Sequence, residues 1–391
     1  MKQITLAKET INKGDIDSLI EWLKTYPRLT KGQLTTQFEK KWSSWLEREY
    51  SLFCNSGSSA NLLMLAALLE GDYISPGSKI VVPALSWATD LSPVMQLGLK
   101  PVLCDINMTD LSVDLEFLEN IFKDESPSAL ILVSVLGLVP HMDEIVRLCE
   151  KYNVILLEDV CESIGSEYKG QKLGTFGLMS TFSTYFGHHI STIEGGVVST
   201  DDKDLINILK SIRSHGWDRD MDSDQQTKLR NEWKINGFNS LYTFYHAGFN
   251  LRSTDLQAFI GLGQLDKLDD ICKQRNKNFI LYNKLIDNPF WSAKEDKDKF
   301  ISNFAFPVIH PNKSIIVKML QEKNIETRPL ICGSLGKQPF YVKKYGEDDL
   351  SNVSAVDEYG FYLPNHPLLT EEEIEFISTI VNTGIKDGEC L

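Results

Sequence analysis

Uninterrupted apolar segments joined by helical patterns constrain the fold of this chain most. The segments "KIVVPAL" from Lys79, "ALILVSVLGL" from Ala129 and "NVILLEDV" from Asn153 read as strands, and an amphipathic segment, "MDEIVRLCEKY", separates the last two. Strands that are apolar on both faces and connected by helices are typical of a parallel sheet covered by helices on either side. The sequence therefore predicts an α/β fold.

Two further patterns divide the chain. The segment "ANLLMLAALLEG" from Ala60 is apolar on nearly every side and ends in glycine, which predicts a buried helix packed on the sheet. After about Asp255 the pattern changes to one long helical stretch rich in charge, followed by short strands around "NFAFPVI" and a helix before "IETRPLI". We therefore predict a large domain over residues 1–255 and a smaller C-terminal domain over residues 256–391. Thr370 and Glu373 in "TEEEIEFI" predict a capping box for the last helix.

Composition excludes several classes of function. Hydrophobic residues make up 42% of the 391 residues, as in ordinary globular proteins, and the formal net charge of −14 disfavours a nucleic-acid partner. The longest apolar runs are too short to span a bilayer, and "MKQITLAKETINKGD" lacks the apolar core of a signal peptide. We expect a cytoplasmic protein without a membrane partner. The seven cysteines show no two-residue or four-residue spacing, so neither disulfides nor a metal site are predicted.

Small polar residues precede the predicted buried helix. In "CNSGSSANLLM", Gly57 and Ser58 can bring backbone NH groups and hydroxyls together around an anion such as a phosphate. Plain helix capping is the alternative, because Ser and Asn are favoured before any helix.

Acidic and aromatic residues lie at other predicted strand ends. Glu158 and Asp159 close the strand "VILLED", where ligands bind in open α/β sheets, although Asp159 could instead cap a helix. Trp87 follows "VVPAL" and could stack on a flat ligand or fill the core.

The segment "FSTYFGHHISTIEGG" adds a hydroxyl at Ser183 and two adjacent histidines, His188 and His189. Neighbours in an extended segment point to opposite sides, so we expect only one histidine to face the site. Histidine titrates nearest neutral pH and is suited to proton transfer.

Taken together and in this order, these segments resemble those of the sugar aminotransferase family that uses pyridoxal 5'-phosphate (PLP). The resemblance covers essentially the whole chain, through "NSGSSANLLM", "VPALSWATD", "LLEDVCESIG", "GFNLRSTDLQA" and "GFYLPNHP". It implies an aminotransferase fold of type I, with a mostly parallel seven-stranded sheet between helices and a smaller α+β C-terminal domain.

The resemblance also implies roles for individual residues. Gly57, Ser58 and Ser183 would hold the cofactor phosphate, Trp87 would stack on the pyridine ring, and Asp159 would pair with the ring nitrogen. Such a pair keeps the ring protonated and able to absorb electrons.

The resemblance also assigns one residue to the site of a second subunit. Asn250 in "GFNLRSTD" would reach the cofactor phosphate of a neighbouring copy, which implies a homodimer with shared sites.

One position departs from the aminotransferase pattern. Where those enzymes read S-x-x-x-x-K-N, with a lysine that bonds to the cofactor, this chain has Ser183 followed by His188. An imidazole can move protons but cannot tether the cofactor or complete an amination. "HHISTIEGG" and "CESIG", with Glu162 where aminotransferases usually have glutamine, resemble the histidine-containing branch of sugar 3-dehydratases.

That branch implies a reaction. L-Glutamate converts PLP to pyridoxamine 5'-phosphate and leaves as 2-oxoglutarate. A nucleotide-linked 4-keto-6-deoxyhexose, with GDP-4-keto-6-deoxymannose favoured, then loses its C3 hydroxyl with His188 as the base. The products are a 3,6-dideoxy-4-keto sugar and ammonia. CDP and dTDP stay open as the nucleotide.

A related group of dehydratases uses a two-iron cluster held by cysteines, two of them separated by one residue. Here the closest pair is Cys149 and Cys161, so we expect no iron–sulfur cluster.

Two other functions stay open: a sugar aminotransferase that tolerates histidine, and an inactive cofactor-binding homologue with a regulatory role. His215, Arg219, Arg252 and Arg328 are candidates for binding substrate phosphates or carboxylates, because Arg suits bidentate contacts, but each could equally form a surface ion pair.

Overall fold

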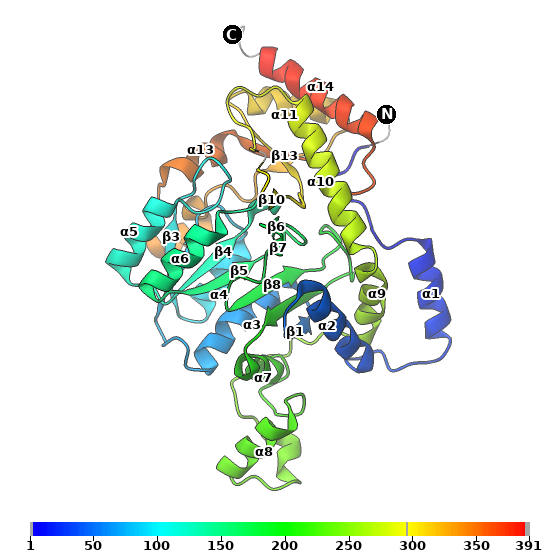
Figure 1. The fold of residues 1–391 in the computed structure, drawn as a ribbon, viewed down its shortest axis with the longest axis vertical. Coiled ribbons are helices and arrows are strands. Elements are labelled where there is room, and N and C mark those ends of the chain that lie inside the picture. Colours follow the sequence, from blue (N-terminus) through cyan, green and yellow to red (C-terminus); the bar gives the residue numbers. More distant parts are fainter. Residues whose placement is uncertain (1–2, 295, 388–391) are drawn as a thin grey trace.

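A seven-stranded sheet forms the centre of the computed structural model, which describes residues 3–294 and 296–387 (Figure 1). From one edge to the other its strands are β1 (Tyr50–Cys54), β9 (Gly196–Thr200), β8 (Met179–Ser183), β5 (Ile155–Asp159), β4 (Ala129–Val133), β2 (Lys79–Pro83) and β3 (Lys100–Cys104). Neighbouring strands are parallel except that β9 runs antiparallel to both β8 and β1. The predicted mostly parallel sheet is therefore confirmed.

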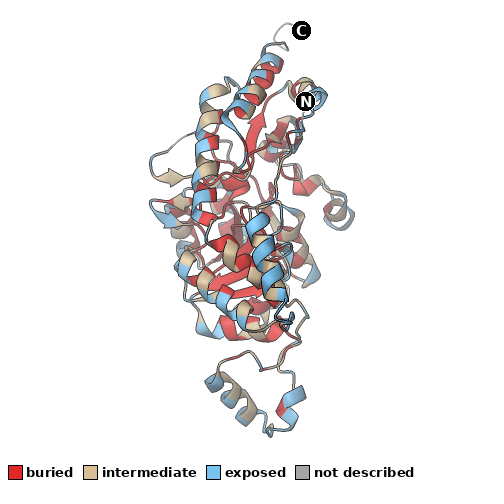
Figure 2. Ribbon diagram, turned by 90° about the vertical axis from the view of Figure 1, so that its right-hand side faces the viewer, coloured by how far each residue is buried: buried red, intermediate tan, exposed pale blue. Residues whose placement is uncertain are grey.

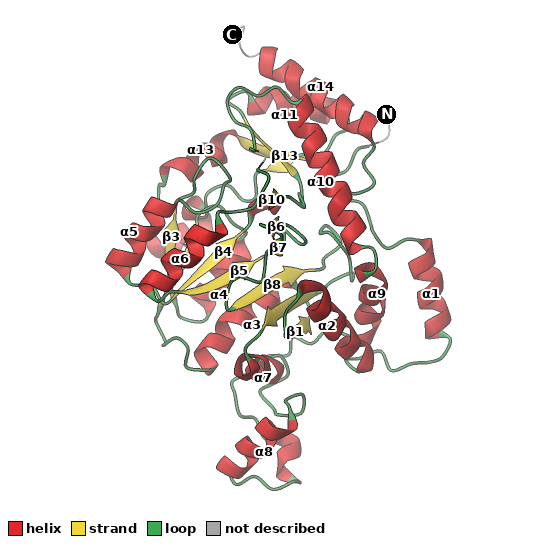
Figure 3. Cartoon of the chain, in the orientation of Figure 1, coloured by secondary structure: helices red, strands yellow, loops and turns green. Residues whose placement is uncertain are grey.

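Helices cover both faces of this sheet (Figures 1 and 3). On one face lie α3 (Gly57–Glu70), α4 (Ala88–Gln96) and α7 (Lys203–Ile212), and on the other lie α5 (Leu115–Glu125) and α6 (Met142–Tyr152). The helix α3 is buried along almost its whole length, as its sequence predicts, and α6 has the bounds of the predicted amphipathic segment. Figure 2 shows the strands in the buried interior and the outer faces of the helices exposed.

The C-terminal part begins with two helices rather than the one long helix that we predicted. A break at Asp266 and Lys267 separates α9 (Asp255–Leu265) from α10 (Leu268–Leu285). The Asp255 carboxylate accepts hydrogen bonds from the backbone NH groups of Gly32 and Thr35, so α9 stays packed on α2 (Gln33–Leu46). The division into residues 1–255 and 256–391 remains a prediction.

The remaining C-terminal elements form a small α+β unit. Its sheet has the order β11 (Phe306–Ile309), β13 (Gly360–Leu363) and β12 (Arg328–Pro329), all antiparallel. Its helices are α11 (Lys313–Glu322), α12 (Pro339–Tyr345), α13 (Ser351–Tyr359) and α14 (Glu371–Asp387). The capping box before α14 is confirmed, because the Thr370 backbone NH lies 3.0 Å from Glu373 Oε2 and the Glu373 NH lies 3.1 Å from Thr370 Oγ1.

An arm projects from the body between α7 and α9. It contains α8 (Ser223–Glu232) and a short 3-10 helix, Asn239–Tyr242, and it lies at the bottom of Figure 1, away from the sheet. Large apolar side chains on this arm face solvent: Phe238 is 82% exposed and Tyr242 is 75% exposed.

Four short elements complete the description: α1 (Lys13–Leu23) and a small sheet of β10 (Lys299–Phe300), β6 (Glu167–Tyr168) and β7 (Gln171–Lys172). Across residues 3–294 and 296–387, none of the helices combines the length and apolar character needed to cross a bilayer.

Candidate active site

A cavity of about 420 Å³ lies where β4, β5 and β8 end. The starts of α3 and α4 form part of its wall, and Phe304, Ile331 and Tyr362 of the C-terminal part close it from the other side. Seven of the predicted site residues line this one cavity: Gly57, Ser58, Trp87, Asp159, Glu162, Ser183 and His188. The carboxyl ends of parallel strands meet at one edge of a sheet, which explains why residues spread over more than a hundred positions come together.

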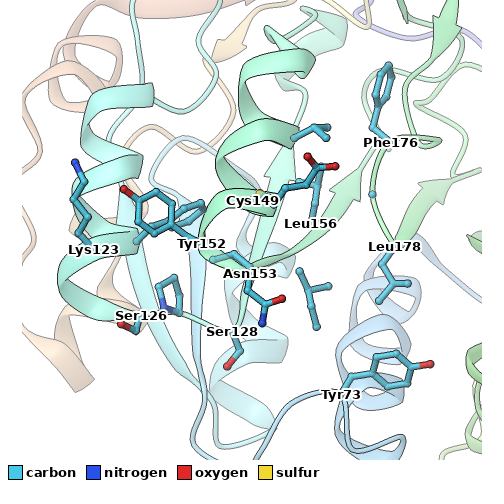
Figure 4. A pocket seen from close by; sticks show the side chains of 17 residues that line it. Tyr73, Lys123, Ser126, Ser128, Cys149, Tyr152, Asn153, Leu156, Phe176 and Leu178 are labelled. Atoms are coloured by element: carbon cyan, nitrogen blue, oxygen red, sulfur yellow. The ribbon is translucent and has the colours of Figure 1, made fainter.

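A larger and more open cavity, of about 980 Å³, lies at the opposite ends of the strands (Figure 4). Ser128, Asn153 and Leu178, which precede or begin strands, are among its lining residues. None of the predicted site residues lines it, so the smaller cavity is the candidate active site.

One end of the smaller cavity is suited to an anion. Ser56 caps α3, since its side chain accepts a hydrogen bond from the Ser59 NH, so the cap lies at the same helix end as the predicted anion site. A Cβ added to Gly57 would lie 2.6 Å from Ser183 Cβ, so only glycine allows Ser183 to approach the helix this closely. The free NH groups of the first turn, together with the Ser58 and Ser183 hydroxyls, can receive a phosphate.

Asp159 lies at the carboxyl end of β5 and is 7% exposed. Its Oδ1 accepts a hydrogen bond of 2.8 Å from the Cys161 NH, and its Oδ2 accepts one of 2.7 Å from Asn61 Nδ2. No helix begins after it, so the alternative of helix capping is wrong. Glu158 points elsewhere: its carboxylate accepts hydrogen bonds from the backbone NH groups of Gly174, Phe176 and Gly177 and holds that loop.

Trp87 and Glu162 occupy other parts of the wall. Trp87 stands at the N-cap position of α4 with 56% of its surface exposed, so its ring is free to stack on a ligand rather than filling the core. Glu162 Oε2 accepts a hydrogen bond of 2.9 Å from the Leu136 NH. Burial raises the pKa of Glu162 to about 7, and the nearby Asp159 charge adds to this rise.

Only one of the two histidines lines the cavity, and the segment that carries them is not extended. Residues 185–190 form turns and bends, which corrects our expectation of alternating side chains. The turn directs His188 into the cavity, whereas His189 is fully buried with Nε2 3.0 Å from the Ser302 carbonyl oxygen. Burial lowers the pKa of His188 to about 4, against the attraction of Asp159, so its imidazole is neutral at pH 7 and can accept a proton.

Arg275 supports His188 from α10, and the sequence offered no signal for it. It is 2% exposed, and its Nη1 donates 2.8 Å to the Phe304 carbonyl oxygen, while Nη2 donates 3.3 Å to the His188 carbonyl oxygen. Burial lowers the pKa of this guanidinium to about 10. The side chain thereby ties the turn over residues 185–190 to the C-terminal part of the chain.

The other five predicted residues do not line the cavity. Asn250, His215, Arg219 and Arg252 lie at or near the base of the arm, where the Arg219 guanidinium lies 3.9 Å from the Trp217 ring centroid and Arg252 Nε donates 3.1 Å to Asn250 Oδ1. Arg328 is exposed on β12, opposite the lining residue Tyr362 in register. Their assignment to substrate or partner binding remains a prediction.

Comparison with known proteins places this chain in a family. Residues 10–382 match the sequence profile of the DegT/DnrJ/EryC1/StrS aminotransferase family. The chain belongs to this family. It is 32% identical to the GDP-4-keto-6-deoxy-D-mannose 3-dehydratase of Yersinia pseudotuberculosis, over 97% of this chain and 98% of the relative. It is also 26% identical to the GDP-perosamine synthase of Caulobacter vibrioides, over 96% of each chain.

Solved structures of the DegT/DnrJ/EryC1/StrS family have the same fold. A GDP-4-keto-6-deoxymannose-3-dehydratase with a trapped PLP-glutamate geminal diamine is 30% identical, with a TM-score of 0.87 over 97% of this chain and 100% of that one. The predicted aminotransferase fold is thereby confirmed. Family membership leaves the choice between dehydration and amination open, because relatives of both kinds match nearly the whole chain.

Proposed function

We propose that the protein is a PLP-dependent 3-dehydratase acting on a nucleotide-linked 4-keto-6-deoxyhexose, with GDP-4-keto-6-deoxymannose as the first substrate to test. The observation that carries the proposal is the basic group in the cavity. His188 lines it, and the described lining residues include neither lysine nor arginine. Without a lysine amine to tether the cofactor, the site is suited to moving protons rather than to completing an amination.

The residues present fit PLP. The start of α3 with Ser58 and Ser183 suits its phosphate, and the exposed face of Trp87 suits its ring. Asp159, buried at the other side of the same cavity, suits the ring nitrogen. The relative with PLP and glutamate in its structure supports both compounds as partners of this chain.

Two side chains of this protein, those of Asp159 and His188, have separate roles in the proposed reaction. When bound, PLP and its amine form supply an electron sink that lets a hydroxyl leave the neighbouring sugar carbon. Asp159 holds the ring nitrogen in its protonated form. The neutral His188 imidazole takes up a proton at Nδ1 or Nε2 and can return it. Overall, one glutamate and one keto sugar give 2-oxoglutarate, ammonia and the 3-deoxy sugar. The sugar hydroxyl leaves as water, the keto oxygen of 2-oxoglutarate comes from water, and the two electrons that glutamate loses reduce the sugar.

Amination of the same sugar is the second candidate, favoured by the match to a GDP-perosamine synthase. An inactive homologue with a regulatory role is the third. The two active candidates give different products from the same mixture.

The mass of the sugar product separates these functions. We expect purified protein, PLP, glutamate and GDP-4-keto-6-deoxymannose to give a product lighter by one oxygen, with ammonia released in equal amount. A product with oxygen exchanged for an amine, and no ammonia, would make the protein an aminotransferase. Unchanged substrate with GDP, CDP and dTDP sugars alike, although PLP binds, would favour the inactive homologue. A reaction without protein is the control.

We also propose that two copies of the chain share their sites. A cavity that receives a phosphate but has no lysine or arginine in its described lining needs positive charge from elsewhere. Arg219 and Arg252 lie near the base of the arm, and exposed aromatic side chains such as Phe238 lie on it. A second copy that buries these aromatic side chains can bring Asn250 and the arginines to the cavity.

Mixing two inactive variants tests this arrangement. We expect Asn250→Ala and His188→Asn each to be inactive as pure dimers and to regain roughly a quarter of the wild-type activity after subunit exchange, because half of the molecules then hold one intact site. Light scattering gives the mass, expected at twice 44.3 kDa. A monomeric mass, or a dimer without recovery, would contradict shared sites.

A further inference from the structure

A second buried carboxyl group lies in the wall of the candidate cofactor site, where Asn61 and Asp90 are among the lining residues. Asp90, in the first turn of α4, is 1% exposed, and its Oδ1 lies 3.0 Å from Asn61 Nδ2. The same amide nitrogen lies 2.7 Å from Asp159 Oδ2, so one amide serves two carboxyl groups. Asn61, also 1% exposed, is the one polar residue in the apolar middle of α3.

The orientation of this amide is set by a third residue. Thr181 Oγ1 on β8 donates a hydrogen bond of 2.6 Å to Asn61 Oδ1, so Nδ2 must face the two carboxyl groups. Asp90 in turn reaches the cavity wall, because its Oδ2 accepts a hydrogen bond of 3.1 Å from the Trp87 NH. These hydrogen bonds therefore connect Asp159, which is expected to contact the ring nitrogen of the cofactor, with the backbone of Trp87, which is expected to stack on the ring.

The charges around Asp90 are unbalanced if every acid is ionised. Asp159 and Glu162 are nearby acids, and the Cys161 and Cys332 thiols, whose pKa values are raised in part by the Asp90 charge, are the other titratable groups facing it. The described residues lining the cavity provide no lysine or arginine to compensate. Two buried carboxylates that share one amide, with one backbone NH each besides it, cannot both hold a charge at low cost when another acid lies nearby. Burial raises the pKa of Asp90 well above its usual range, and the Asp159 charge raises it further.

We propose that Asp90 is a positioning residue that keeps its proton at neutral pH and, through Asn61, leaves Asp159 as the single anion facing the cofactor ring while fixing the backbone of Trp87. The role of Asp90 toward PLP rests on the proposed function, whereas the protonation of Asp90 is a property of the chain alone. The simpler role, an ionised Asp90 that only caps α4, predicts different behaviour of an asparagine variant.

Thermal unfolding of the PLP-free protein against pH tests the proton. A carboxyl group that stays protonated in the folded state costs stability as pH rises above its unfolded pKa of about 3.9, and asparagine does not titrate. We therefore expect the melting temperature of Asp90→Asn to rise relative to wild type between pH 5 and pH 8, by at least about 3 °C. Glu162 and the thiols titrate in both proteins, so the difference between the two curves isolates Asp90.

A matched control comes from another buried aspartate. Asp105 is 4% exposed and accepts hydrogen bonds from the backbone NH groups of Asn352 and Val353. We expect Asp105→Asn to melt below wild type, with no relative gain as pH rises from 5 to 8.

PLP affinity, measured by titration of the PLP-free proteins, tests the positioning role. Asparagine keeps the shape of aspartate: its Oδ1 can accept from the Trp87 NH, as Asp90 Oδ2 does, and its NH2 group can donate to the neighbouring Asp159, as a protonated carboxyl group would. Asp90→Asn should therefore bind PLP within about threefold of wild type. Asp90→Ala, which leaves the Trp87 NH without its acceptor, should bind about tenfold more weakly. If the alanine variant does not fold, Asp90→Ser provides the same comparison.

The other possible results of these experiments each contradict a different part of the proposal. Absence of a pH-dependent gain for Asp90→Asn would show that Asp90 is ionised and would overturn the proposal. Equal PLP affinity of all three proteins would remove the positioning role. Failure of wild type itself to bind PLP would contradict the proposed function, while the melting curves would still report the proton on Asp90.

Discussion

The substitution Asp159→Asn is expected to lower turnover more than about 100-fold while leaving the fold intact. The asparagine oxygen can still accept from the Cys161 NH, which lies 2.8 Å from Asp159 Oδ1. The negative charge is lost, however, and an amide cannot hold the ring nitrogen of the cofactor in its protonated form. Product formation by mass spectrometry and thermal unfolding are the two measurements. The melting temperature should stay within about 3 °C of wild type.

A surface aspartate provides the control for this variant. Asp143 is exposed in the first turn of α6, where it pairs with Lys169, so Asp143→Asn should leave turnover unchanged. A near-normal rate in Asp159→Asn would remove Asp159 from the reaction. A folded variant that no longer binds PLP would assign Asp159 to cofactor affinity instead of to turnover, and single-turnover rates at saturating PLP separate these two effects.

The substitution His188→Lys is expected to suppress dehydration at least about 100-fold and to attach the cofactor to the chain. The His188 imidazole, whose pKa burial lowers to about 4, is neutral at pH 7 and therefore free to take a proton from the reacting groups, whereas an amine in the same cavity bonds to the cofactor aldehyde. Reduction with borohydride followed by peptide mass spectrometry should find the cofactor on the peptide that contains position 188. Wild type, whose lysines lie outside the described cavity lining, is the control and should not be labelled there.

Efficient deoxygenation by His188→Lys would show that another residue is the base. His189 and His215 are the next histidines to test as the base, although neither lines the cavity. His189 is fully buried against Ser302, so its participation would require the turn over residues 185–190 to rearrange.

Much of the fold and half of the site follow from local sequence. Strands such as Ile155–Asp159 are apolar on both faces, and a parallel sheet is the architecture that buries both. Residues that end such strands, among them Asp159 and Ser183, meet at the same edge because the carboxyl ends of parallel strands lie there. The histidine at position 188, where the aminotransferase pattern has lysine, is also a local feature of the sequence, and the proposed function rests on it.

Contacts between distant segments could not be predicted in this way. Phe304 and Tyr362 close the cavity from the C-terminal part, and Arg275 reaches the His188 carbonyl from α10, with nothing in their own segments to mark them. Asn61 carried a weak signal as a polar residue in an apolar helix, but its partners Asp90 and Asp159 come from other elements.

The sequence by itself determined the type of sheet, the order of the elements and the residue types at the strand ends, because these depend on apolar patterning over a few neighbouring residues. Only the tertiary structure decided which histidine enters the cavity, which acid faces the loop at Gly174 and which two carboxyl groups share one amide. Those choices depend on side-chain packing and on the exclusion of water between segments far apart in the chain, and no local pattern records them.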